Sequence, residues 1–236
     1  FGHEPTLACL EQGADMVIEK RLSTYIDSLS WDIPEYLQEV EKDAVMAEVP
    51  VIKRSTQTLL AFLLDMAKPA AVLEIGTAVG FSSMLVSEYT KESTIIDTIE
   101  KVPARIKCAK ENFKKYNKES RINLIEGEAS EILELLASQG KKYNFVFMDA
   151  AKGQYMNFVV PVYKMLYAGG ILVTDNVLQD GDILESRYAI TRRDRTIHGR
   201  MRQYLYYLTH SEEWNTVILP VGDGVSVSVK KVKEGS

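Results

Sequence analysis

The sequence has few cysteines and no long run of apolar residues. Its two cysteines, Cys9 and Cys108, form neither a disulfide framework nor a metal-binding motif, which suits a reducing compartment. No apolar stretch approaches the roughly 20 residues that cross a bilayer, and no secretory signal stands at the front. We therefore expect a cytoplasmic protein with no membrane partner.

An excess of positive charge is also missing. The formal net charge of −5 argues against a protein that coats nucleic acid indiscriminately, although it leaves room for a local basic patch. The 236 residues are 46% hydrophobic and 26% charged, as in a globular protein with a full core. Residues 1–15 lack an initiator Met, whereas Met16 resembles a natural start, so we expect 1–15 to be upstream or non-native and 16–236 to form one domain.

Helical patterns come first, and strands and helices then alternate. Three helices are expected within 16–67, the second opened by Pro34 and the third capped by Ser55, as an N-terminal cover. The alternation over 71–231 predicts a Rossmann-like α/β fold, with a seven-stranded, mostly parallel sheet and helices on both faces. After a strand that starts at Ala71, the expected strands are 94–100, 122–126, 143–149 and 170–175, with helices over 104–116, 129–138, 154–166 and 196–208 and a closing hairpin of 214–219 and 224–230.

A glycine loop follows the first strand. Gly76 and Gly80 can adopt backbone angles closed to other residues, and a helix begins at Phe81. A ligand against this loop meets a helix N-terminus, as in nucleotide-binding pockets. The spacing lacks the G-x-G-x-x-G pattern, which disfavours a dinucleotide. The alternative is an ordinary strand-to-helix turn that contains glycines.

Acidic residues stand where several strands end, and ligands of such sheets collect there. Glu100, about 20 residues past the glycine loop, suits ribose hydroxyls, although it could also be a solvated strand end. Asp149 and the pair Asp175–Asn176 should close neighbouring strands and offer hard oxygens to Mg²⁺ or a similar cation. Lys152 could then accept a proton. Each of these residues taken alone is more often structural.

Four short motifs carry a resemblance to a known family. They are Leu-Glu-Ile-Gly-Thr at 73–77, Ile-Glu at 99–100, Met-Asp-Ala-Ala-Lys at 148–152 and Thr-Asp-Asn-Val at 174–177. Over roughly residues 49–231 the chain resembles the class I S-adenosylmethionine-dependent O-methyltransferases of the metal-dependent catechol and caffeoyl-CoA type. One departure is the basic pair Lys53–Arg54, in a segment where the caffeoyl type has a further acid, which disfavours a plant phenol as substrate.

The resemblance implies two cofactors, S-adenosylmethionine and Mg²⁺ or Mn²⁺, and a role for each matching residue. Lys152 would be the base, and Asp149 would also serve catalysis. The metal ligands would be Asp149, Asp175 and Asn176. The cofactor-binding residues would be Ile52, Glu74, Gly76, Ser82, Glu100, Glu128, Ala129 and Asp149.

Two further segments are similar to the bacterial tRNA 5-hydroxyuridine methyltransferases, which make 5-methoxyuridine at the wobble position. They are Asp-Asn-Val-Leu-Gln-Asp-Gly at 175–181 and Arg-Arg-Asp-Arg-Thr-Ile-His at 192–198. Six of the chain's ten arginines lie between positions 187 and 202, and on an acidic protein such a cluster suits RNA phosphates. We expect it to bind the tRNA anticodon loop through Arg187, Arg192, Arg193, Arg195, Arg200 and Arg202.

Other interpretations remain open at this stage. The arginines could instead pair with acids across a dimer interface, and a homodimer is expected. Within the class, the alternative is a small-molecule catechol-type enzyme. Outside it, the chain could be a non-catalytic nucleotide-binding protein or a dehydrogenase, although the missing G-x-G-x-x-G disfavours the latter.

Overall fold

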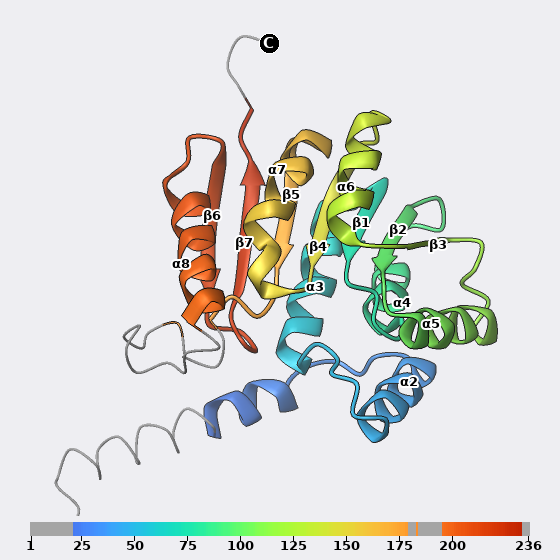
Figure 1. Cartoon of the computed structure of the whole chain (residues 1–236). Coiled ribbons are helices and arrows are strands. Elements are labelled where there is room, and N and C mark those ends of the chain that lie inside the picture. Colours follow the sequence, from blue (N-terminus) through green and yellow to red (C-terminus); the bar gives the residue numbers. More distant parts are fainter. Residues whose placement is uncertain (1–20, 179–182, 184–194, 233–236) are drawn as a thin grey trace, which may run out of the picture. The chain divides into compact units, whose positions relative to one another are not determined.

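The computed structural model describes residues 21–178, 183 and 195–232 (Figure 1). The chain divides into two compact units, residues 1–32 and 33–236. In the first unit, residues 21–28 are helical. The division falls inside the predicted N-terminal cover, and the expectation of a non-native segment at 1–15 lies outside the described residues.

The second unit alternates helices and strands in the predicted order. No helix among the described residues has the length and apolar character needed to cross a bilayer. The elements are α2 (Glu35–Met46), α3 (Arg54–Ala67), β1 (Ala71–Ile75), α4 (Phe81–Glu88), β2 (Ile95–Glu100), α5 (Pro103–Lys115), β3 (Ile122–Glu126), α6 (Ala129–Ser138), β4 (Tyr143–Met148), the 3₁₀ turn η1 (Lys152–Gln154), α7 (Tyr155–Met165), β5 (Leu166–Thr174), α8 (Arg195–His210), β6 (Trp214–Leu219) and β7 (Val225–Lys230).

The strands form one seven-stranded sheet in the order β3-β2-β1-β4-β5-β7-β6. Strands β1 to β5 run parallel, whereas β7 is antiparallel to both β5 and β6. The predicted fold class, a mostly parallel Rossmann-like sheet, is therefore confirmed. The order changes direction at β1 and β4, which is the kind of switch point where α/β proteins bind ligands.

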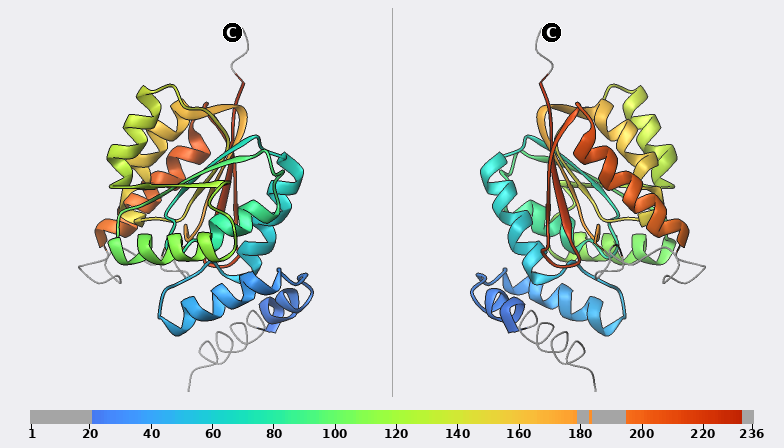
Figure 2. Two further views of the ribbon diagram at one scale, coloured as in Figure 1. Left: turned by 90° about the vertical axis from the view of Figure 1, so that its right-hand side faces the viewer. Right: turned by 90° about the vertical axis from the view of Figure 1, so that its left-hand side faces the viewer.

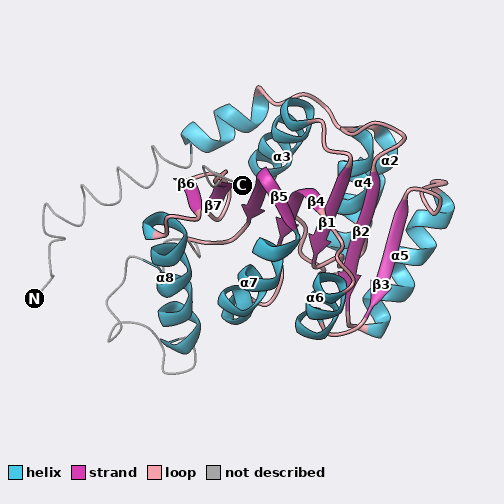
Figure 3. Cartoon of the chain, turned by 90° about the horizontal axis from the view of Figure 1, so that it is seen from above, coloured by secondary structure: helices cyan, strands magenta, loops and turns pink. Residues whose placement is uncertain are grey.

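Helices cover both faces of the sheet because side chains alternate along each buried strand. Val72 of β1 and Phe145 of β4 pack into the core under α2, α3, α4 and α5. Their neighbours Leu73 and Val146 face the opposite core, which α6, α7 and α8 close. The two helical layers are separated by the sheet in Figures 2 and 3.

Several boundaries shift by one or two residues from those predicted, and two differences have an identifiable cause. Strand β5 begins at Leu166 rather than Gly170, because α7 passes directly into extended backbone and Leu166 pairs with Tyr143 before an irregularity in the register. Helix α3 begins at Arg54, with Lys53 as its N-cap residue and no side-chain cap, so the prediction that Ser55 caps it is wrong. The segment before α3 is held instead by Gln57, whose Nε2 donates to the Ile52 carbonyl at 2.9 Å.

Replacing Leu73 with Ala tests the central packing. This side chain is fully buried, so its loss should lower the free energy of unfolding by about 2–5 kcal/mol, measured by urea denaturation. Ile95→Ala is the control on the next strand, because Ile95 is 59% exposed and should cost less than about 1 kcal/mol. Similar losses in both variants would contradict the assigned core.

Candidate functional site

The loop between β1 and α4 lies unusually close to the end of β4. Gly76 has a φ of +106°, and its N–H donates to the Ile99 carbonyl at 3.1 Å. A Cβ at Gly76 would lie only 2.0 Å from the Asp149 carbonyl oxygen. Since a side chain is excluded by both conformation and space, glycine is required here.

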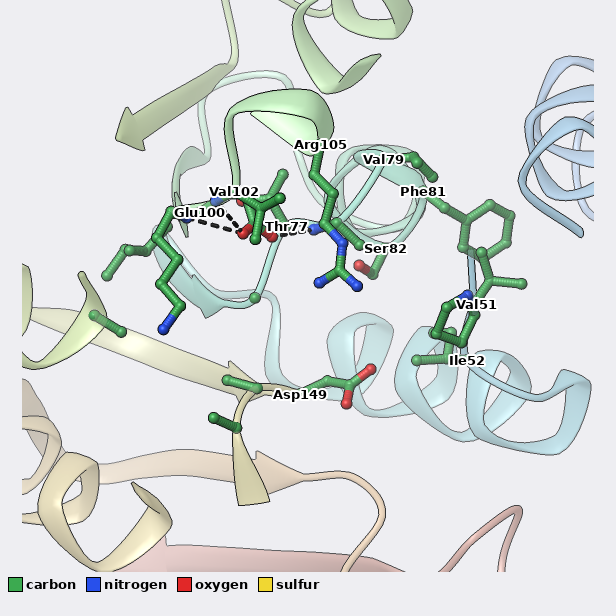
Figure 4. A pocket seen from close by; sticks show the side chains of 18 of the residues that line it. Val51, Ile52, Thr77, Val79, Phe81, Ser82, Glu100, Val102, Arg105 and Asp149 are labelled. Atoms are coloured by element: carbon green, nitrogen blue, oxygen red, sulfur yellow. Dashed lines mark hydrogen bonds between the residues drawn. The ribbon is translucent and has the colours of Figure 1, made fainter. Parts of the chain in front are cut away.

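A cavity of about 360 Å³ opens beside this loop (Figure 4). It is enclosed by the ends of β1, β2 and β4 and by the segment before α3. Seven of the eight predicted cofactor residues line it, namely Ile52, Gly76, Ser82, Glu100, Glu128, Ala129 and Asp149. The structure thus brings together residues that are up to 97 positions apart in the chain (52 to 149).

Glu100 stands at the end of β2, where its carboxylate binds backbone N–H groups. It accepts hydrogen bonds from Ala78 at 3.0 Å, Lys101 at 2.8 Å and Val102 at 2.9 Å. The carboxylate is therefore fixed between the glycine loop and the start of α5, and it faces the cavity in Figure 4. Such a preorganised acceptor is suited to hydroxyl groups of a ligand.

Glu74 is the predicted cofactor residue that does not line the cavity. Its side chain is fully buried behind the glycine loop, where it accepts hydrogen bonds from the hydroxyls of Ser83 and, at 2.5 Å, Thr98. Burial raises the pKa of this carboxyl. The prediction of direct cofactor contact is not supported by this placement, because Glu74 precedes the strand end and turns toward α4. Through these two hydrogen bonds, Glu74 connects α4 to β2.

Two acids and an amide meet at the ends of β4 and β5. The strands pair up to Met148 and Thr174, so the residues that follow them, Asp149 and Asp175, come close together. The Asn176 Nδ2 donates to Asp149 Oδ1 at 3.2 Å. The predicted neighbourhood is confirmed, although no group of three or more His, Cys, Asp and Glu among the described residues could hold a metal.

The pKa values of both carboxyls are raised. Burial, then the neighbouring Asp149 charge, raises the pKa of Asp175 to about 7. Burial likewise raises the pKa of Asp149, which the Asn176 hydrogen bond and the Lys152 charge partly oppose. Within the described part of the chain, neither carboxylate has an ion-pair partner. This pair therefore favours a bound positive charge.

The predicted base, Lys152, lies in a turn that packs against the helix with the described part of the arginine cluster. Lys152 begins the turn η1, which packs against α8, and Arg200 Nη1 donates to the Gly153 carbonyl at 3.0 Å. Arg195 and Arg202 lie on the same helix, with Arg202 exposed. The other predicted RNA-binding residues lie outside the described residues: Arg187, Arg192 and Arg193.

Sequence reasoning missed Arg105, a lining residue of the cavity in the first turn of α5. Figure 4 shows its side chain extending into the cavity. Its position could have been inferred, because Pro103 marks the start of a helix directly after the β2 acid. The first turn of that helix had to lie beside the strand ends.

Comparisons with known proteins identify the family of the chain. A family model described as O-methyltransferase matches residues 27–231. A Mycobacterium marinum protein described as "Putative O-methyltransferase" is 27% identical over 188 residues, covering 79% of this chain and 81% of that protein.

Solved structures share the fold. A Staphylococcus aureus protein described as a "putative caffeoyl-CoA O-methyltransferase" has 30% identity and a TM-score of 0.81, over 88% of this chain and 98% of that one. The Podospora anserina methyltransferase PaMTH1, solved with SAH bound, has 26% identity and a TM-score of 0.78, over 98% of this chain and 100% of that one.

The chain belongs to the O-methyltransferase family. The class of enzyme predicted from the sequence is thereby confirmed.

Gly76→Ala tests the close approach. The added methyl should collide with the main chain at Asp149, lower stability by more than about 2 kcal/mol and close the cavity to ligands. Gly140→Ala is a matched control, because Gly140 also has a positive φ, +73°, with nothing within 4 Å of its added Cβ. Calorimetric unfolding of both variants separates collision from conformational strain. Equal losses would contradict the assigned contact.

Proposed function

We propose that this protein is an S-adenosylmethionine-dependent, divalent-metal-assisted methyltransferase that acts on 5-hydroxyuridine at the wobble position of tRNA. The observation that carries the proposal is the adjacency of three features at one sheet edge. The cavity beside Gly76 and the acid pair share Asp149, and Arg200 fixes a helix with three arginines to the turn of Lys152. The product would be 5-methoxyuridine.

The cavity supplies what an adenosine-containing cofactor requires. Glu100 would accept hydrogen bonds from the ribose hydroxyls, and Glu128 and Ala129 would lie beside the adenine. Ser82, at the N-terminus of α4, and the loop at Gly76 would hold the amino-acid end. Support comes from PaMTH1, a relative of the same fold that was solved with SAH bound.

The acid pair fits a divalent cation. Asp175 is buried and Asp149 is half-buried, and neither carboxylate has an ion-pair partner in the described part of the chain. The Asn176 amide contacts Asp149 directly. Hard oxygen donors of this kind suit Mg²⁺ or Mn²⁺, which would join Asp149, Asp175 and Asn176. A cation held there would lower the pKa of an acceptor hydroxyl and fix its orientation.

The protein's own residues then position the reaction. Methyl transfer needs the acceptor oxygen in line with the sulfonium methyl, so proximity supplies much of the rate. Asp149 lines the cofactor cavity and contacts Asn176, so it links the two halves of the site. Lys152 lies one turn beyond Asp149. As a neutral amine, it would take the proton of the acceptor hydroxyl.

The acceptor class follows from chelation and charge. A catechol offers two vicinal oxygens, and 5-hydroxyuracil offers its 5-oxygen beside the O4 carbonyl, which makes the same five-membered ring with a cation. One metal site could therefore serve both. The arginines of α8 favour an RNA loop with a splayed base. A small diphenol is the second candidate, favoured by the Staphylococcus aureus relative described as a caffeoyl-CoA enzyme.

Removing the metal should abolish activity. Methylation should vanish in EDTA and return with Mg²⁺ or Mn²⁺, because the acid pair supplies only hard oxygens. Mg²⁺ should also raise the melting temperature of the wild type but not of Asp175→Ala. The exposed Asp65 is the control, since Asp65→Ala should keep the Mg²⁺ response. Full activity in the presence of the chelator would contradict the proposed role of a metal ion in catalysis.

The arginine cluster should make tRNA binding depend on salt. Arg192, Arg193 and Arg195 are replaced together with Gln. The slope of the logarithm of the tRNA binding constant against the logarithm of the salt concentration should then flatten by about 0.7–0.9 per lost phosphate contact. Methylation of tRNA should be abolished. Filter binding across a salt series measures the slope.

A control removes the same charge elsewhere. Lys91, Lys107 and Lys114 are exposed, and their triple Gln variant should keep the wild-type slope. If the arginine variant keeps the slope and dissociates from dimer to monomer, the cluster serves an interface and the RNA assignment fails.

A further inference from the structure

The cavity beside the Gly76 loop is lined by several charged side chains. Five charged residues line it: Glu100, Lys101, Arg105, Glu128 and Asp149. Lys101 is paired with Glu128 at 2.9 Å, and Glu100 is held by backbone N–H groups. Arg105 differs from these residues, since it has no hydrogen bond or ion pair with any other described residue.

The position of Arg105 directs its charge into the cavity. The residue stands in the first turn of α5, three positions past Val102, and its guanidinium extends toward the side of Ser82 and Asp149 in Figure 4. Arg105 and Asp149 line the same cavity. A ligand in the cavity must therefore lie within the field of this cation.

The co-substrate and product of a methyl transfer differ mainly in charge. Both carry the same adenosine, ammonium and carboxylate groups, whereas only S-adenosylmethionine has a positive sulfonium. S-adenosylhomocysteine has a neutral thioether at the same atom. Any contact to the shared groups changes both affinities alike, so the ratio of the two affinities reports only on the charge at sulfur and the methyl group that the sulfur carries.

We propose that Arg105 sets this ratio and shifts it toward the thioether product. The inference rests on the proposed function, since it requires the cavity to bind both ligands. Two like charges in one cavity, partly screened by solvent and salt, repel enough to change a ratio of dissociation constants by about three- to tenfold. Asp149 attracts the sulfonium, and Arg105 reduces that attraction.

Isothermal titration of the full chain with both ligands tests the inference. In Arg105→Gln, the ratio of the dissociation constant for S-adenosylmethionine to that for S-adenosylhomocysteine should fall about three- to tenfold from the wild-type value. Arg105→Lys is the matched control, because it keeps the charge while changing the shape, and its ratio should stay within about twofold of wild type. Raising the salt concentration should shrink the difference between Arg105→Gln and wild type.

Two results would overturn the inference in different ways. An unchanged ratio in Arg105→Gln, even with both affinities weakened, would show that the guanidinium acts only through groups that the two ligands share. A wild type that binds neither ligand would refute the proposed function, and the inference would fall with it.

Discussion

The close approach between the Gly76 loop and the end of β4 is the constraint on which the site depends. Beyond the strand ends, the parallel hydrogen bonding continues, from Asp149 N–H to the Ile75 carbonyl at 3.0 Å and from Asp175 N–H to the Met148 carbonyl at 3.0 Å. The backbone is therefore rigid where the acids stand. Gly76 lets two backbone segments of the chain approach closely. The cavity and the acid pair therefore share one residue, Asp149. A reaction between two bound groups requires that proximity.

Much of this arrangement could be predicted from the sequence because its signals are local. The strand Ile122–Glu126, the helix Ala129–Ser138 and the strand Trp214–Leu219 have the predicted bounds, since each has a clear hydrophobic period. The meeting of Asp149 and Asp175 followed from the rule that neighbouring parallel strands end at one edge. These inferences needed no knowledge of distant contacts.

The remaining features depend on tertiary contacts that no local pattern encodes. Glu74 has the residue type of a ligand-binding acid, yet the packing of α4 buries it behind the loop, where it braces Ser83 and Thr98. Arg105 is an ordinary exposed position of an amphipathic helix until α5 is placed beside the cavity. The early start of β5 likewise depends on the partner Tyr143, which lies 23 positions before Leu166.

The acid pair, proposed as a chelating site, and the basic helix α8 together bear on the identity of the acceptor. The most direct measurement is mass spectrometry of nucleosides from tRNA that bears 5-hydroxyuridine, after incubation with the protein, S-adenosylmethionine and Mg²⁺. We expect loss of 5-hydroxyuridine and an equal gain of 5-methoxyuridine. Unchanged 5-hydroxyuridine in a preparation that methylates a small diphenol would contradict this expectation.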